Sequence, residues 1–294
     1  MKIICFYSAK ILKRDSKMQN KLEQIKTNKN LKIKQISSQE WWSFELKQFR
    51  VKHKREWTGI KELDKKLVNY DFYSATPDSE KEVPLVISLQ GIGAPIQFSF
   101  YQIKPILEMG FAWVGIDAPF GGSRNINDGK VVILPKIEKR LKDSGYHKYW
   151  IKDCFDIVNE DLTNLVEHIL PTKFKIDKNK IALIGVSFGT MLATWSFVNQ
   201  DFGNRVLGMI GHGNIKFMGK MNPLHSAHKI ESPRKYHLML GGSDGLINPR
   251  MAEELVNKMP SGSMEIAPNV GHGGKNFDEA SVKTISEQLE DWKN

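Results

Sequence analysis

Short apolar segments alternate with amphipathic ones from residue 83 onward. Six of them have the length of a strand and are mostly apolar: residues 83–89, 111–116, 181–186, 206–210, 236–240 and 264–267. Short apolar runs without strict alternation are typical of strands buried on both faces, as in a parallel sheet. The sequence therefore predicts a sheet that is covered on both sides.

The segments between these runs have helical periodicity. Residues 151–169 and 282–292 carry apolar side chains at steps of three and four, with charged residues between them. Pro249 suits the first turn of a helix that continues through residues 251–258. Strands that alternate with helices predict an α/β fold, in which a mostly parallel, doubly wound sheet has helices on both faces.

The first 82 residues follow a different pattern. Residues 10–34 are rich in Lys, Gln and Asn and predict a solvated helix or loop. Three other segments have the composition of strands, namely residues 3–9, 44–57 and 67–75. We expect residues 1–82 to form an N-terminal extension that contains the first strands and packs on a core of residues 83–294. Both parts are then expected to belong to one structural domain.

The charge of the chain is concentrated in this extension. The whole chain has 43 Lys and Arg against 33 Asp and Glu, a formal net charge of +10. Residues 1–82 hold 19 basic and 11 acidic residues, a net charge of +8, and residues 83–294 hold 24 and 22. A basic stretch favours acidic partners, so weak docking of the extension on an acidic surface or a membrane stays open beside the alternative of a solvated face. The sequence contains no platform of aromatic and basic residues, so we do not expect it to bind nucleic acid.

The sequence favours a cytoplasmic protein. Its apolar stretches are far shorter than the roughly 20 residues that cross a bilayer, and residues 3–9 lack the cleavage site of a signal peptide. The two cysteines, Cys5 and Cys154, form neither a disulfide framework nor a metal-binding pattern. We therefore expect a reducing compartment, no metal and no cofactor, with Cys154 buried and inert.

The residues suited to chemistry follow the predicted strands, at the edge of the sheet where ligands bind in such folds. Residues 185–189 read G-x-S-x-G between a predicted strand and a predicted helix, which is the sequence of a nucleophile elbow. The turn lifts Ser187 off the sheet, and the glycines permit the close approach that it requires. A plain turn serine is the alternative interpretation.

A serine hydroxyl is a weak nucleophile at neutral pH, so it needs a base, and the base needs an orienting carboxylate. His272 follows the last predicted strand in a Gly-His-Gly-Gly loop, and Asp244 follows the strand before it. Three alternatives stay open. Asp244 could be the N-cap of the helix at Pro249, His272 could be an ordinary loop residue, and His212 could be the base or a pocket residue.

The chain order Ser187, Asp244, His272 is that of the α/β-hydrolases. Residues 80–294 resemble this superfamily through four motifs: the elbow, G-x-x-D-x-x-x-x-P at residues 241–249, Gly-His-Gly at residues 271–273, and Asp-Ala-Pro-Phe-Gly-Gly-Ser at residues 117–123. The chain is most similar to the esterase, dienelactone-hydrolase-like and prolyl-oligopeptidase-like branches. The resemblance implies the α/β-hydrolase fold, with a small cap formed by residues 124–150 or 214–235.

The resemblance also implies an oxyanion hole made of two backbone N–H groups. One belongs to Phe188, directly after the nucleophile, and the other is expected from Ile92 in the loop after residues 83–89. This loop often begins with His-Gly in the family but reads Gln-Gly at residues 90–91 here. Asp117 is expected to hold the turn at residues 121–124, with Arg124 as its partner.

Together these residues predict a serine hydrolase. Ser187 attacks an acyl carbonyl, His272 moves the proton and Asp244 holds the imidazole, after which water releases the acyl group. We expect a small-molecule substrate, a carboxylic ester or thioester of a small or medium acyl group, as for a carboxylesterase-like enzyme (EC 3.1.1). The alternatives are a prolyl-oligopeptidase-like peptidase and a binding protein without catalytic activity on the same fold.

Overall fold

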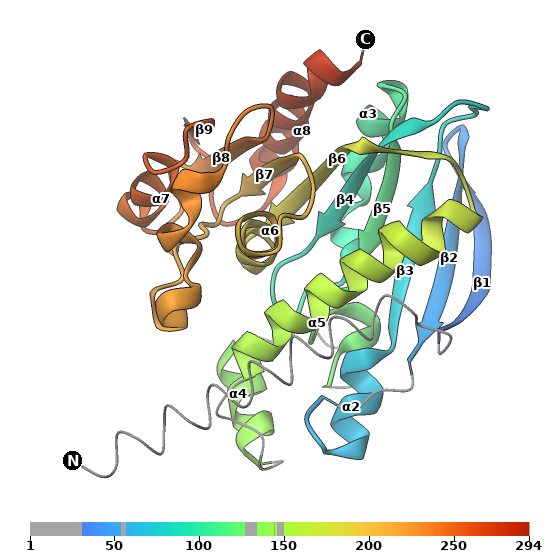
Figure 1. Cartoon of the computed structure of the whole chain (residues 1–294), viewed down its shortest axis with the longest axis horizontal. Coiled ribbons are helices and arrows are strands. Elements are labelled where there is room, and N and C mark those ends of the chain that lie inside the picture. Colours follow the sequence, from blue (N-terminus) through green and yellow to red (C-terminus); the bar gives the residue numbers. More distant parts are fainter. Residues whose placement is uncertain (1–30, 54–56, 127–133, 144, 146–149, 294) are drawn as a thin grey trace.

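Nine strands form one sheet in the computed structural model, which describes residues 31–53, 57–126, 134–143, 145 and 150–293 (Figure 1). Their order across the sheet is β1-β2-β3-β5-β4-β6-β7-β8-β9. The strands are β1 (Lys32–Trp41), β2 (Phe44–Lys52), β3 (Tyr70–Ala75), β4 (Val83–Leu89), β5 (Ala112–Ile116), β6 (Ile176–Val186), β7 (Arg205–Met209), β8 (Lys235–Gly241) and β9 (Gly262–Ala267).

Most of the sheet is parallel. All pairings from β5 to β9 are parallel, whereas those of β1 with β2, β2 with β3 and β3 with β5 are antiparallel. Because parallel strands point the same way, β4 to β9 all end at one edge of the sheet. The predicted fold class is confirmed, and each of the six apolar runs from residue 83 onward overlaps a strand.

Helices cover both faces of the sheet (Figure 1). The core of one face includes Phe155 from α5 and Leu192 from α6, and the core of the other includes Ile106 from α3 and Ile285 from α8. The α-helices are α2 (Lys61–Val68), α3 (Ile103–Glu108), α4 (Leu134–Asp143), α5 (Trp150–Asn164), α6 (Phe188–Asn199), α7 (Pro249–Val256) and α8 (Lys275–Leu289). Shorter helical segments are η1 (Ile96–Gln102), η2 (Gly122–Arg124), η3 (Leu165–Ile169), η4 (Leu170–Thr172), η5 (Lys216–Met221), η6 (Pro223–His225), η7 (Ala227–Lys229) and η8 (Glu290–Trp292).

The basic extension supplies three strands of this same sheet. β2 and β3 lie within the segments that the sequence predicted as strands, and helix α2 separates them. The sequence did not predict β1, because nine of its ten residues are exposed and polar side chains dominate it. The predicted strand at residues 3–9 and the residue Cys5 lie outside the described residues.

The two stretches that were expected to form a cap contain short helical segments. Residues 214–235 include η5, η6 and η7, and the described part of the first stretch contains α4 and Arg124, the last residue of η2. The side-chain oxygen of Asn222 accepts hydrogen bonds from the backbone N–H groups of Ile215 (2.8 Å) and Leu224 (3.3 Å). Asn214 links this segment to α7 by donating to Glu254 (2.8 Å).

No helix in the described part of the chain is long and apolar enough to cross a membrane. Cys154 on α5 is buried in the core, as predicted, and burial raises the pKa of its thiol well above the ordinary value. A thiol that stays protonated is a poor nucleophile, so Cys154 is unsuited to catalysis.

Candidate active site

Ser187 lies in a strained turn between β6 and α6. Its backbone has φ 54° and ψ −114°, a conformation that is rare for a residue with a side chain. The flanking glycines make the turn possible. A Cβ atom on Gly185 would lie 2.4 Å from the carbonyl oxygen of Gly189, and one on Gly189 would lie 2.1 Å from that of Leu89. The turn thus has the geometry of a nucleophile elbow, with the serine at the carboxyl edge of the sheet.

His272 reaches Ser187 from the loop after β9. Its Nε2 atom lies 2.9 Å from the Oγ atom of Ser187. Gly273 and Gly274 have φ of 111° and 94°, which glycine adopts readily, and they turn the chain directly after the imidazole. The loop also binds the end of β8, because the N–H of Ser243 donates to the carbonyl of Val270 (2.9 Å).

Asp244 completes the chain of contacts. Its Oδ2 atom lies 2.8 Å from Nδ1 of His272, and its Oδ1 atom accepts a hydrogen bond from the N–H of Leu246 (2.8 Å). The carboxylate side chain is only 2% exposed, against 26% for the imidazole. The N-cap of α7 is Asn248, which accepts from the N–H of Arg250, so the alternative of Asp244 as that N-cap is wrong.

Both expected oxyanion donors are close to Ser187. Phe188 follows it in the sequence, and Ile92 belongs to a loop that packs beside it. Phe188 is the first residue of α6, so its N–H has no acceptor within the helix. Gly91 packs against Ser187, since a Cβ atom on it would lie 3.4 Å from that of Ser187, and Ile92 is the next residue. The loop of Ile92 therefore passes next to the serine.

Gln90 holds the start of this loop. Its amide nitrogen donates to the hydroxyl of Ser99 (2.6 Å), and its amide oxygen accepts from the N–H of Gly91 (3.2 Å). Both side chains are buried. Gln90 stands where the superfamily that the sequence resembles often has histidine. The structure gives it an anchoring position that the sequence did not reveal, because Ser99 carries no motif.

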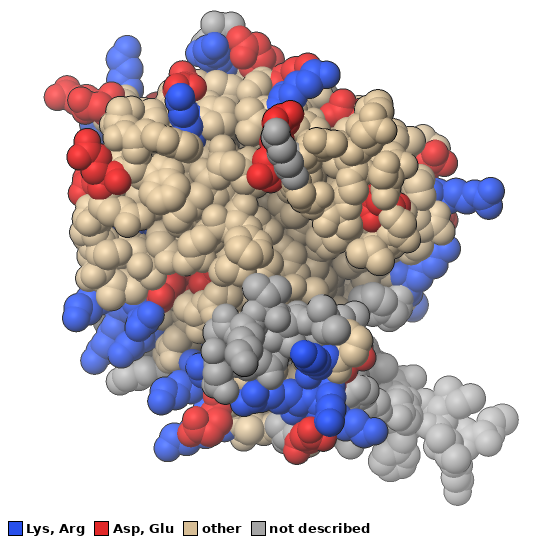
Figure 2. Space-filling model, turned by 180° about the vertical axis from the view of Figure 1, so that it is seen from behind, with Lys and Arg blue, Asp and Glu red and all other residues tan. Residues whose placement is uncertain are grey.

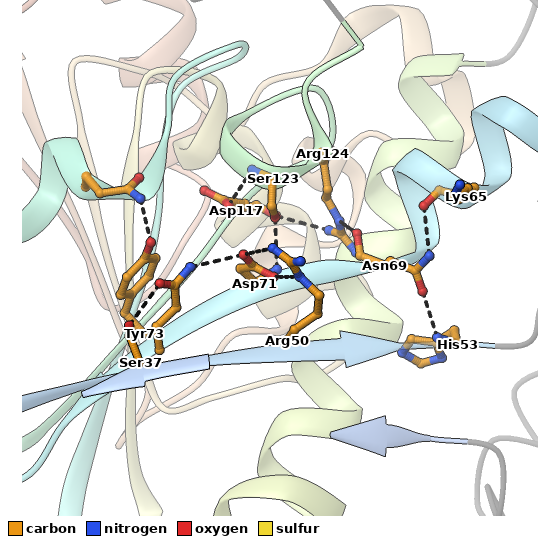
Figure 3. A network of polar contacts seen from close by, with 12 residues as sticks. Ser37, Arg50, His53, Lys65, Asn69, Asp71, Tyr73, Asp117, Ser123 and Arg124 are labelled. Carbon is orange, nitrogen blue, oxygen red and sulfur yellow. Dashed lines mark hydrogen bonds and ion pairs between the residues drawn. The ribbon is translucent and has the colours of Figure 1, made fainter. Parts of the chain in front are cut away.

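Asp117 holds the turn after β5, as expected, but Arg124 has a different partner. Asp117 Oδ2 accepts from the N–H of Ser123 (2.8 Å; Figure 3). Burial raises the pKa of the carboxyl. Arg124 donates to the backbone carbonyl of Asp117 (3.1 Å) and forms its ion pair with Asp161 on α5 (2.5 Å). The expected pairing of Arg124 with the Asp117 carboxylate is therefore wrong, because a closer acid comes from a helix 37 residues further along the chain.

His212 lies in the loop after β7, next to the elbow. A Cβ atom on the preceding Gly211 would lie 2.6 Å from the carbonyl oxygen of Ser187. The imidazole is buried, which lowers its pKa, and its Nδ1 atom has no hydrogen-bond partner among the described residues. The hydroxyl of Ser187 contacts His272 instead, so the geometry favours His272 over His212 as the base.

Within the described residues, no group of three or more His, Cys, Asp and Glu side chains is arranged to hold a metal ion. The chemistry available at this edge of the sheet is that of the serine, the imidazole, the carboxylate and the backbone N–H groups around them.

Solved structures similar to this chain include esterases and other hydrolases, whereas no protein-family model and no curated protein matches its sequence. Acetyl xylan esterase 1 from Thermoanaerobacterium sp. has a TM-score of 0.63 at 14% identity, over 94% of this chain and 93% of that chain. S-formylglutathione hydrolase from Agrobacterium tumefaciens has 0.57 at 14%, over 88% and 98%. An acylaminoacyl peptidase from Pyrococcus horikoshii has 0.56 at 11%, over 91% of this chain and 42% of that chain. At such low identities the likeness shows a shared fold.

Proposed function

We propose that this protein, which has the α/β-hydrolase fold, is a serine hydrolase that cleaves a carboxylic ester or thioester. The observation that supports the proposal best is the continuous chain of contacts from Ser187 through His272 to Asp244, at 2.9 and 2.8 Å. Ser187 is half-buried and His272 is exposed, so a substrate can reach both. The three residues follow three separate strands, β6, β8 and β9.

Each residue has a role in the reaction that we propose. Asp244 accepts a hydrogen bond from the Nδ1–H of His272 and so holds the tautomer in which Nε2 is free to take the proton of the Ser187 hydroxyl. The oxygen then attacks the acyl carbonyl, and the N–H groups of Phe188 and Ile92 stabilise the negative oxygen that develops. The imidazolium returns the proton to the leaving group, and water hydrolyses the acyl-enzyme by the same steps.

The substrate that we propose carries a small acyl group. Acetyl xylan esterase and S-formylglutathione hydrolase, two of the similar structures, are named for esters or thioesters of one- and two-carbon acyl groups. We expect 4-nitrophenyl acetate to be cleaved faster than esters of longer acids. A rate that rises steadily up to eight carbons would contradict a small acyl pocket.

A fluorophosphonate probe tests the nucleophile. The wild-type protein should be labelled at Ser187, and Ser187→Ala should lose both the labelling and the esterase activity. Ser196 on the same helix α6 is buried, and Ser196→Ala is the matched control that keeps both. Folded wild-type protein that the probe does not label would refute the enzyme and support a non-catalytic binding protein.

A peptidase is the second candidate, because the acylaminoacyl peptidase shares the fold over 91% of this chain. Blocked aminoacyl 4-nitroanilides, tested beside the esters, separate the two reactions. We expect hydrolysis of esters with little hydrolysis of anilides. Comparable kcat/KM for both substrate types would favour the peptidase.

A further inference from the structure

We propose that Asp117 is a positioning residue for the oxyanion hole, because it fixes the loop that carries Ile92. This inference rests on the proposed function and adds a residue that lies outside the contacts of Ser187, His272 and Asp244. Asp117 directly follows β5 and is only 1% exposed.

The two carboxylate oxygens of Asp117 bind two different segments. Oδ1 accepts from the N–H of Ile96, the first residue of η1 (3.0 Å), and Oδ2 accepts from the N–H of Ser123 (2.8 Å). Ile96 ends the loop that begins after Leu89. One carboxylate therefore joins the far end of the oxyanion loop to the turn after β5.

The loop between these fixed points has little room to move. Its start is held by Gln90, and Gly91 lies against Ser187. Ala94 donates its N–H to the carbonyl of Gly91 (3.1 Å), and its own carbonyl lies against Gly121, where a Cβ atom would approach to 2.3 Å. A shift of Ile96 or of residue 121 would thus be passed on to the backbone of Ile92.

The turn that Asp117 uses as its support is itself anchored on the N-terminal strands (Figure 3). The hydroxyl of Ser123 accepts from the N–H of Asp71 on β3 (2.9 Å). Asp71 in turn binds the guanidinium of Arg50 on β2 through two hydrogen bonds of 2.7 and 2.8 Å. The oxyanion loop is therefore connected by polar contacts to strands outside the parallel part of the sheet.

Asp117→Asn tests the proposal with a side chain of nearly the same size. An ionised carboxylate accepts at both oxygens, whereas an amide turns an NH₂ group towards the N–H of either Ile96 or Ser123. We expect kcat for 4-nitrophenyl acetate to fall about tenfold to a hundredfold, somewhat less than the loss of a whole oxyanion donor, with KM nearly unchanged.

Inhibition by phenylboronic acid separates positioning from a loss of folded protein. The boronic acid forms a tetrahedral adduct with a catalytic serine and places an oxygen in the oxyanion hole. We expect its inhibition constant to rise by a factor similar to the fall in kcat/KM. A variant that merely contains less active protein would lower the rate but keep the inhibition constant of wild type.

Two further variants keep the test decisive. Asp64 is another buried aspartate that accepts backbone N–H groups, from Trp57 (3.0 Å), Thr58 (2.7 Å) and Gly59 (3.1 Å) at the start of α2. Asp64→Asn should lower the midpoint of thermal unfolding yet keep the inhibition constant of wild type.

Gly121→Ala is the second variant. It pushes on the Ala94 carbonyl and leaves Asp117 in place, so it should raise the inhibition constant even if Asp117→Asn does not fold.

The outcomes also distinguish this proposal from the proposed function. If wild type is labelled and Ser187→Ala is inactive, but Asp117→Asn and Gly121→Ala keep the wild-type kcat and inhibition constant, the positioning role is refuted alone. If Ser187→Ala keeps full activity, the proposed function itself fails. A rise of the inhibition constant in both loop variants, without one in Asp64→Asn, supports the positioning role.

Discussion

At the scale of single residues, close backbone contact around Ser187 decides which residues the chain can accept. Gly189 shows this most clearly, because a Cβ atom there would lie 2.1 Å from the carbonyl oxygen of Leu89 on the neighbouring strand β4. Backbone cannot yield as the end of a side chain can. The glycine is therefore required by packing of α6 against β4, independently of any catalytic step.

Gly189→Ala should destabilise the fold by about 1–3 kcal/mol, as other overpacked core positions do. Urea denaturation monitored by tryptophan fluorescence measures the change in the free energy of unfolding. Gly245→Ala is the control, since nothing lies within 4 Å of a Cβ atom at that position. Equal stability of the two variants would mean that α6 can move away from β4 without cost.

The contact between Asp244 and His272 leads to a second expectation at this scale. Asp244→Asn would offer Nδ1 of His272 a donor and stabilise the wrong tautomer, so kcat should fall by about 10⁴ while the fold is kept. Steady-state hydrolysis of 4-nitrophenyl acetate measures this loss. The exposed Asp278, at the start of α8, provides the control Asp278→Asn. A loss of less than tenfold would show that Asp244 does not orient the base.

At the scale of elements, ion pairs connect η8 to the starts of β7 and β8, at the edge of the sheet opposite the candidate site. Arg205, at the start of β7, forms an ion pair with Asp291 of η8 (2.6 Å), and its guanidinium lies 4.3 Å from the ring centroid of Trp292. Lys235 at the start of β8 binds the same carboxylate (2.7 Å). These contacts hold the end of α8, the helix that follows the loop of His272.

This ion pair should make stability depend on pH. The hydrogen bond from Arg205, and next that from Lys235, lower the pKa of Asp291 below its ordinary value. The folded state thus favours the ionised carboxylate, and its stabilising contribution is present above the ordinary pKa and is lost as the pH falls below it. The free energy of unfolding should decline between about pH 5 and pH 2 less steeply in Asp291→Asn than in wild type. Asp78→Asn, at an exposed position, is the control. If the free energy of unfolding declined equally steeply in wild type and in Asp291→Asn, the role of Asp291 would be contradicted.

Elements differ in how well the sequence predicts them, and burial explains the difference. The strands β4 to β8 are buried on both faces and leave apolar runs in the sequence, whereas β1 is exposed and leaves none.

The residues of the candidate site also differ in how well the sequence predicts them. The candidate triad could be predicted because each member follows a strand and carries a recognisable motif. The pairing of Arg124 with Asp161 could not, because it depends on how α5 packs on the turn after β5.

At the scale of the whole molecule, charge is unevenly distributed. Figure 2 shows a face whose centre has few charged side chains, with Lys and Arg gathered towards the end of the molecule at which α2 and α4 lie in Figure 1. The exposed basic residues of these helices are Lys61, Lys65, Lys66, Lys136, Lys139, Arg140 and Lys142. The basic character of the sequence is thus also present in the described part of the chain.

Deletion of residues 1–30 tests whether the extension docks on acidic membranes. These residues hold eight basic and two acidic side chains, a net charge of +6, and the deletion leaves β1 complete. We expect the shortened protein to lose salt-sensitive binding to vesicles that contain phosphatidylserine, and to keep its esterase activity. Neutral phosphatidylcholine vesicles are the control. Equal binding by both forms would exclude this segment as the docking element and direct attention to α2 and α4.

The antiparallel pairing of β3 with β5 has a consequence for where the chain can be divided. Residue 82 marks a change in charge, yet the hydrogen-bonding partner of β5 on that side comes from residues 70–75. A fragment that begins at residue 83 would expose Ala112–Ile116 as an apolar, unpaired edge strand, which is a template for intermolecular pairing. We expect such a fragment to aggregate even though it contains every residue of the candidate triad, and we expect the smallest soluble unit of this hydrolase fold to include its N-terminal strands.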